Sequence, residues 1–192
     1  MALIDVGSDG KTDMLVSYSG TELQQAGVLY YRNMGTAQEP SYTLQPSADN
    51  PFASVARSLL LPMATGDLDG DGDQDLVLGY VSINNQNTSI SVPTEAFEYW
   101  RNNGDGTFTQ LSGVSNPLVD LNLVMAQISQ QVTSGFPFGL PYLGDFNGDG
   151  KIDMGLFLPI SDGSPIVYLP GDGHGGFSFT GVTSVTGLLV PG

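Results

Sequence analysis

The chain has 192 residues and no cysteine, and its 20 acidic residues against 5 basic ones give a formal net charge of −15. This acidic excess disfavours nucleic acid and anionic membrane surfaces as partners, because binding to phosphate groups needs Lys and Arg side chains. The composition also excludes a disulfide framework, and no apolar run approaches the ~18–20 residues of a transmembrane helix. No signal peptide is visible at the N-terminus, and the length fits one domain.

The first predicted element is an acidic loop, DVGSDGKTD, at residues 5–13. A strand of mostly apolar residues is expected directly after it, over residues 14–18. The next segment, at residues 28–44, joins an aromatic strand to a turn and a second run of strand type. After an Asn-Pro pair, a further strand over residues 60–66 leads back into an acidic loop.

The second unit repeats this order with a stronger loop, DLDGDGDQD, at residues 67–75. An apolar strand is predicted over residues 76–80. The segment FEYWRNNGDGTFTQL, at residues 97–111, carries Asn-Gly-Asp-Gly between two β-rich runs, which is a strong hairpin signal. Another Asn-Pro pair follows at residues 116–117.

Two insertions interrupt the second unit. Residues 82–94 lengthen a loop and contain the sequon Asn87-Thr88-Ser89, which is either a glycan acceptor in a secreted protein or a chance match. Residues 118–133 place apolar side chains near a helical period. That segment is interpreted either as a short amphipathic helix or as one strand followed by a long loop.

The third unit has a strand at residues 140–144, the loop DFNGDGKID at residues 145–153, a strand at residues 154–158 and an aromatic segment at residues 166–180. Each unit thus contains about four strands, which is the content of one propeller blade. We therefore predict an all-β fold of about three four-stranded antiparallel blades in a single domain over residues 1–192. The units span approximately residues 1–60, 61–138 and 139–192.

The three loops have the composition of a cage for a hard cation, with glycine at position 6 and oxygen-bearing side chains at positions 1, 3, 5 and 9, except at position 3 of the first loop. Calcium takes six to eight oxygen ligands in a flexible shell. In the second loop we predict the side chains of Asp67, Asp69, Asp71 and Asp75 with the carbonyl of Asp73. In the third loop we predict the side chains of Asp145, Asn147, Asp149 and Asp153 with the carbonyl of Lys151.

The first loop is expected to bind more weakly or to stay empty. It keeps Asp5, Asp9 and Asp13 as ligands, but position 3 is Gly7. A water molecule or the Ser8 hydroxyl would have to replace the missing side chain. An EF-hand is excluded because position 12 is never Glu and the flanking segments are of strand type. Three solvated Asp-Gly turns without metal are the alternative, which three copies in register disfavour.

These residues resemble the FG-GAP/VCBS repeat family, the calcium-loop repeats of integrin-α-like β-propellers. GDLDGDGDQDLVLGY and YWRNNGDGTF match that family's pattern best. The resemblance implies blades of four antiparallel strands, with the calcium loop in a hairpin between neighbouring strands. Because family members usually have about seven blades, we expect either part of a longer propeller or an open arc covered by a partner or by copies of the chain.

The resemblance implies a non-enzymatic module for protein contact, cell adhesion or subunit assembly, stabilised by Ca²⁺ and located outside the cell or in another calcium-rich lumen. The alternative is a propeller lectin, for which Trp100, Tyr30, Tyr31 and Tyr99 are the aromatic candidates, although packing between blades is the stronger explanation for them. Catalysis is not expected. His174 is the single histidine and stands in a glycine-rich turn, and the sequence has no cysteine nucleophile, nucleophile elbow or phosphate-binding loop.

Overall fold

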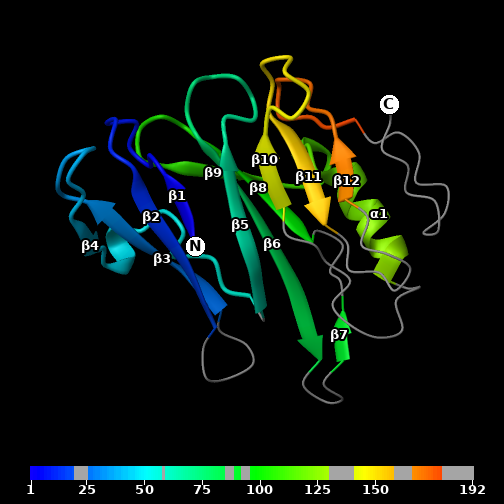
Figure 1. Cartoon of the computed structure of the whole chain (residues 1–192). Helices are drawn as coiled ribbons and strands as arrows, with labels where there is room; N and C mark the ends of the chain where they lie inside the picture. Colours follow the sequence, from blue (N-terminus) through cyan, green and yellow to red (C-terminus); the bar gives the residue numbers. More distant parts are fainter. Residues whose placement is uncertain are drawn as a thin grey trace.

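Three antiparallel sheets stand side by side in the computed structural model (Figure 1), which describes residues 1–19, 26–57, 59–84, 89–91, 96–129, 141–157 and 166–178. The predicted all-β class is therefore confirmed, and the described strands close no barrel. The sheets follow one another along the chain, and we call them blade 1, blade 2 and blade 3.

Blade 1 has the strand order β1-β2-β3-β4. Its strands are β1 (Ala2–Ile4), β2 (Asp13–Ser19), β3 (Ala26–Asn33) and β4 (Tyr42–Leu44). The second and third of these correspond to the strand after the first acidic loop and to the aromatic strand of the sequence.

Blade 2 has the order β5-β6-β8-β9, with β7 paired to the far end of β6. Its strands are β5 (Leu59–Gly66), β6 (Asp75–Asn84), β7 (Ser89–Ser91), β8 (Phe97–Asn102) and β9 (Phe108–Leu111). The predicted hairpin at residues 97–111 is confirmed, with Asn102 opposite Phe108 at its turn. Part of the insertion at residues 82–94 is itself strand, and Asn87 lies outside the described residues.

Blade 3 has the order β10-β11-β12. Its strands are β10 (Pro141–Gly144), β11 (Asp153–Phe157) and β12 (Ile166–Leu169). An isolated bridge between Gly171 and Phe177 continues the chain after β12. The end of the predicted aromatic segment, residues 179–180, lies outside the described residues.

In the part of the chain that the structure describes, helical structure is confined to the connections. Two 3-10 turns, η1 (Ser47–Asp49) and η2 (Gly113–Ser115), precede the Asn-Pro pairs. The helix α1 (Val119–Ser129) confirms the helical interpretation of the second insertion up to residue 129. Asn122 fixes α1 to β8, since its side chain accepts a hydrogen bond from Phe97 N (2.8 Å) and donates one to Phe97 O (2.9 Å).

The core consists of two apolar clusters, one at each junction between blades. The first joins Leu15 and Tyr30 of blade 1 to Leu76 and Trp100 of blade 2. The second joins the other side of blade 2 to blade 3 and includes side chains of α1. A partly buried ion pair adds to the first junction, because Arg57 Nε lies 2.8 Å from an oxygen of the buried Glu98.

No helix in the described part of the chain has the length and apolar character that a bilayer crossing requires.

Candidate metal centre

Each acidic loop joins the first two strands of its blade, so all three occupy equivalent places. The loops lie between β1 and β2, between β5 and β6, and between β10 and β11. In each hairpin the last residue before the loop pairs with the aspartate at position 9: Ile4 with Asp13, Gly66 with Asp75 and Gly144 with Asp153. This is the placement that the family resemblance implied.

The loops share one local fold, which their own side chains hold. The aspartate at position 1 accepts a hydrogen bond from the backbone N–H of position 6 in every copy, with distances of 2.7, 3.1 and 2.9 Å for Asp5, Asp67 and Asp145. The acid at position 5 accepts another from the N–H of position 7. Position 6 has a positive φ in each loop, for example +98° at Gly72, a conformation that glycine adopts without steric cost.

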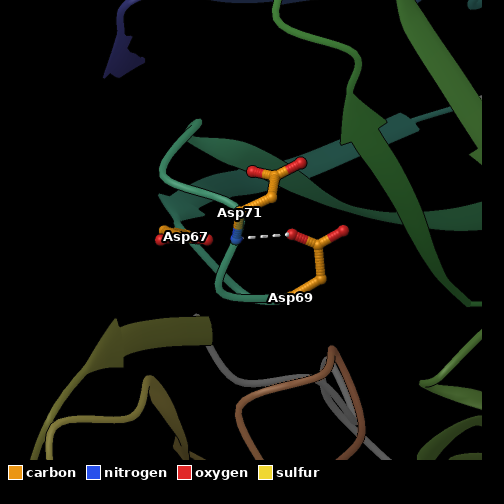
Figure 2. Close-up of side chains that lie close together, drawn as sticks. All are labelled: Asp67, Asp69 and Asp71. Carbon is orange, nitrogen blue, oxygen red and sulfur yellow. Dashed lines mark hydrogen bonds between the residues drawn. The ribbon is translucent and has the colours of Figure 1, made fainter.

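In the second loop, the structure brings three predicted ligands together. Asp67, Asp69 and Asp71 each offer a carboxylate oxygen, and these oxygens lie within 4.8 Å of one another. Figure 2 shows the three side chains on the same turn, with Asp71 N donating to Asp69 Oδ1 at 3.3 Å. Burial raises the pKa of Asp69, and the neighbouring carboxylates of Asp71 and Asp67 raise it further. A cation among these oxygens would remove that repulsion.

The side chain of Asp73 turns away from this group of oxygens. It accepts a hydrogen bond from the Ser8 hydroxyl of the first loop, and its other oxygen lies beside Gly104. Only the backbone carbonyl of Asp73 was predicted as a ligand, so this direction is compatible with the prediction. The Ser8 hydroxyl, considered above as a replacement ligand in the first loop, here joins two blades instead.

Asp75, at position 9 of the second loop, is fully buried and forms three hydrogen bonds. Its Oδ2 accepts from Leu68 N (3.0 Å) and from the hydroxyl of Tyr99 (2.8 Å), and its Oδ1 accepts from Asn102 N (2.9 Å). Burial raises the pKa of Asp75 to about 6, against the lowering effect of these donors. Because a carboxylate oxygen has two lone pairs, Oδ1 retains one that can bind a metal without breaking a hydrogen bond.

The same arrangement recurs in the other two blades. Asp13 accepts from the Tyr30 hydroxyl at 3.0 Å, and Asp153 accepts from the Tyr168 hydroxyl at 3.0 Å. Each also accepts from the N–H of position 2 and from a backbone N–H three residues after the tyrosine. We call this repeated group the Asp–Tyr hub. Sequence analysis did not predict this hub. The signal for it was present, because each of the three aromatic strands contains Tyr-x-x-Asn or Tyr-x-x-Gly.

The third loop resembles the second, with an amide in place of one carboxylate. Asp149 N donates to Asn147 Oδ1 at 2.8 Å and to Asp145 Oδ1 at 3.1 Å, so these two oxygens lie near each other. The Asn147 amide donates to Asp149 Oδ2 at 3.2 Å. An all-oxygen set of this kind suits a hard cation.

Two cationic side chains, Lys11 of the first loop and Arg32 of β3, lie close to the loop's central acid, Asp9. Lys11 Nζ and an Arg32 nitrogen each lie 3.9 Å from Asp9 Oδ2. Both pairs are exposed, so they contribute little to folding stability. They do place two positive charges where a calcium ion would bind. Together with the missing side chain at Gly7, these charges are a reason to expect weak calcium affinity in the first loop.

Of the four aromatic residues predicted for a lectin's sugar site, three are buried. Trp100, Tyr30 and Tyr99 are 5%, 5% and 2% exposed, and both tyrosine hydroxyls belong to Asp–Tyr hubs. Tyr31 is partly exposed. His174 lies exposed in the turn after β12, where its backbone N–H donates to Asp172 at 2.7 Å.

Comparison with known proteins gives one match. A family model described as an FG-GAP-like repeat matches residues 5–78 and again residues 67–156, which together cover more than half of the chain. Searches of curated proteins and of solved structures found no match.

Proposed function

The chain belongs to the FG-GAP-like repeat family, and we propose that its repeats form a calcium-stabilised module for protein contact, adhesion or assembly. FG-GAP-like repeats suggest a protein-interaction role and are generally non-catalytic. The observation that carries the calcium proposal is the second loop, where three carboxylates converge in a turn whose fold is repeated twice more.

Charge supports a structural role for the metal. Eleven of the 20 acidic residues lie in the three loops, so much of the net charge of −15 is ligand charge. Three bound Ca²⁺ ions would reduce it from −15 to −9. Each loop joins two strands, and its position-9 aspartate belongs to an Asp–Tyr hub. An ion in the loop would therefore stabilise the whole hairpin, and metal binding would be coupled to folding.

The proposed ligands are those of the sequence prediction, with two principal sites in the second and third loops and a third, weaker site in the first. The proposed location is extracellular or another calcium-rich lumen, because extracellular calcium modules bind with dissociation constants of about 10⁻⁴–10⁻³ M. A lectin is the less favoured alternative. A sugar needs an exposed aromatic platform, and only Tyr31 among the four candidates offers part of its ring to solvent.

The test compares two variants that each remove one carboxylate. Asp71→Ala removes a member of the triad, and Asp49→Ala removes an exposed acid of η1 outside the loops. At a calcium concentration 10 to 100 times the dissociation constant, one site contributes about 1.4–2.7 kcal/mol. For a domain of this size that corresponds to roughly 3–10 °C in Tm.

We expect the calcium-dependent rise in Tm to shrink by that amount in Asp71→Ala and to stay at the parent value in Asp49→Ala. In a chelator, the Asp71→Ala variant should melt close to the parent. If both variants and the parent gain equally from calcium, the proposed role of the second loop is wrong.

A further inference from the structure

Every blade has two faces, and the register of its strands shows which side chains share each one. Residues directly opposite each other in an antiparallel pair lie on the same face. We call the face toward the preceding blade the leading face and the opposite one the trailing face. In blade 2 the leading face contains Leu76 and Trp100, which pair across β6 and β8. In blade 3 it contains Met154 and Leu169, which pair across β11 and β12.

These two leading faces are buried. Leu76 and Leu78 of blade 2 and Met154 and Leu156 of blade 3 are all fully inaccessible to solvent. The trailing face of the preceding blade covers them. Its central row is Ala2, Leu15 and Tyr30 in blade 1, and Ala64, Val77 and Tyr99 in blade 2. Both junctions in the chain are thus the same contact, made twice.

The leading face of blade 1 has the same register but no described residue covering it. One row crosses all four strands, because Leu3 pairs with Met14, Met14 with Tyr31, and Tyr31 with Leu44. Val16 and Leu29 form a second row. Leu3 and Leu44 are 48% and 49% exposed, and the other four side chains are partly exposed. We call these six residues the blade-1 end face.

The trailing face of blade 3, too, is not covered by another blade among the described residues. Its central row is Tyr142, Gly155 and Tyr168, and Tyr142 is 54% exposed where its counterparts Ala2 and Ala64 are buried. Phe146 is 55% exposed, whereas Val6 and Leu68, at the same loop position, are each 2% exposed. The ring of Phe146 lies over Gly144 and Gly155. We call Tyr142, Phe146, Gly155 and Tyr168 the blade-3 end face.

We propose that the blade-3 end face of one chain docks on the blade-1 end face of a second copy of this chain. The occupant follows from the internal junctions, where the same leading face is covered twice by the same trailing face. In a chain of residues 1–192, each copy presents one described face of each kind, so the contact is head-to-tail, and such contacts form rings when the rotation closes. Two copies would supply six blades, within the range of roughly four to eight found in closed propellers.

This inference rests on the proposed assembly role, and it adds a surface and a partner to it. Phe146 stands at position 2 of the third loop, so an ion in that loop would fix it in the docking surface. Calcium therefore favours association twice, by ordering the loop and by reducing the repulsion between two chains of charge −15.

The experiment measures the mass of the 192-residue chain in calcium by sedimentation and light scattering. Tyr31→Lys places a charge in the blade-1 end face, and Tyr142→Lys places one in the blade-3 end face. Leu123→Lys, on the exposed side of α1 (53% exposed), is the matched control outside both faces. If the Tm of Tyr31→Lys in calcium differs from that of the parent, Leu44→Lys is used in its place to put a charge in the blade-1 end face.

We expect the parent and Leu123→Lys to reach twice the chain mass of 20.2 kDa, and each end-face variant to remain at the single mass. A mixture of Tyr31→Lys and Tyr142→Lys should recover the double mass, because one intact face of each kind remains. A monomeric parent overturns the proposal, as does a Tyr142→Lys variant that still dimerises. Thermal melts with and without calcium show separately whether the calcium proposal holds, so the two failures are distinguishable.

Discussion

The buried carboxylate of Asp75 has two roles that place opposite demands on it. As a member of the Asp–Tyr hub it accepts three hydrogen bonds inside the blade, which is how a buried acid is tolerated. As a proposed ligand it must also bind the metal through the remaining lone pair of Oδ1. The hub therefore links the loop to the aromatic strand β8, and the same link exists at Asp13 and Asp153.

Removing the tyrosine hydroxyl from one hub should cost stability. Tyr99→Phe leaves the buried Asp75 carboxylate with one donor fewer, and hydrogen bonds to charged groups contribute about 1.5–3 kcal/mol. We expect a loss of that size in the free energy of urea unfolding at pH 7.5. Tyr31→Phe removes the hydroxyl of a partly exposed tyrosine in blade 1 and should be close to neutral. Equal losses in the two variants would contradict a specific role for the hub.

The pH dependence of the calcium-free protein has a defined sign at Asp75. Its folded pKa of about 6 lies above the ordinary aspartate value of 3.8, so the stabilising contribution is complete below about pH 4 and is lost as pH rises through 6. In chelator, the parent should therefore become more stable between pH 7.5 and 5. Asp75→Asn should show a smaller gain over the same interval.

Calcium should reverse this dependence. Protonated carboxyl groups bind calcium poorly, so the calcium-dependent gain in Tm should shrink as pH falls below 6. Urea unfolding at several pH values, with and without calcium, measures both effects. If the parent protein, measured in chelator, loses stability as the pH falls from 7.5 to 5, the burial effect at Asp75 is contradicted.

The metal-ligand candidates could be chosen from sequence because their spacing is local. Asp67, Asp69 and Asp71 lie in one turn, and positions two residues apart on a tight turn converge without help from the rest of the fold. The hub could not be chosen in this way. Tyr99 lies 24 residues after Asp75, and only the pairing of β6 with β8 brings them together.

At the scale of elements, the loop conformation depends on glycines with positive φ. Gly72 has a φ of +98°, and a Cβ added there would meet no atom within 4 Å, so Gly72→Ala tests the backbone alone. We expect a loss of about 1–2 kcal/mol in unfolding free energy, the cost of a left-handed conformation for an L-residue.

Gly7→Ala is the control for that change. Gly7 also has free space around its missing Cβ, but its φ is not in the left-handed region. Its unfolding free energy should stay within about 0.5 kcal/mol of the parent, as is usual for surface substitutions. A similar loss in both alanine variants would show that the loop glycines are not needed for their φ.

The strands next to the loops were predictable because sequence repetition and apolar runs agree there. β2, β6 and β11 all begin at the position-9 aspartate. The helix α1 could not be decided from sequence, because its apolar residues fall only near a helical period and a short apolar run also fits a strand. β7 was not predicted, since Ser89–Ser91 is short and polar and pairs only through the extended end of β6. The unit boundaries at residues 60 and 138 stay a prediction.

For the whole molecule, repetition predicts the type of contact between blades but not how many blades meet. Leu76 and Met154 are buried because a preceding blade covers them, while Met14 has the same place in its own blade without a described cover. The amino-acid types at these positions are similar, so the sequence alone does not distinguish a covered face from an open one. The structure makes that distinction, and it identifies the two end faces.

A crystal structure of the chain grown in calcium tests the central claim most directly. The account predicts an ion in the loops at residues 67–75 and 145–153, with carboxylate and carbonyl oxygens at about 2.3–2.6 Å. In the second loop these oxygens should come from Asp67, Asp69, Asp71 and the carbonyl of Asp73, with Oδ1 of Asp75 beside them. Loops that contain only water in saturating calcium, with the triad oxygens hydrogen-bonded to solvent, would contradict it.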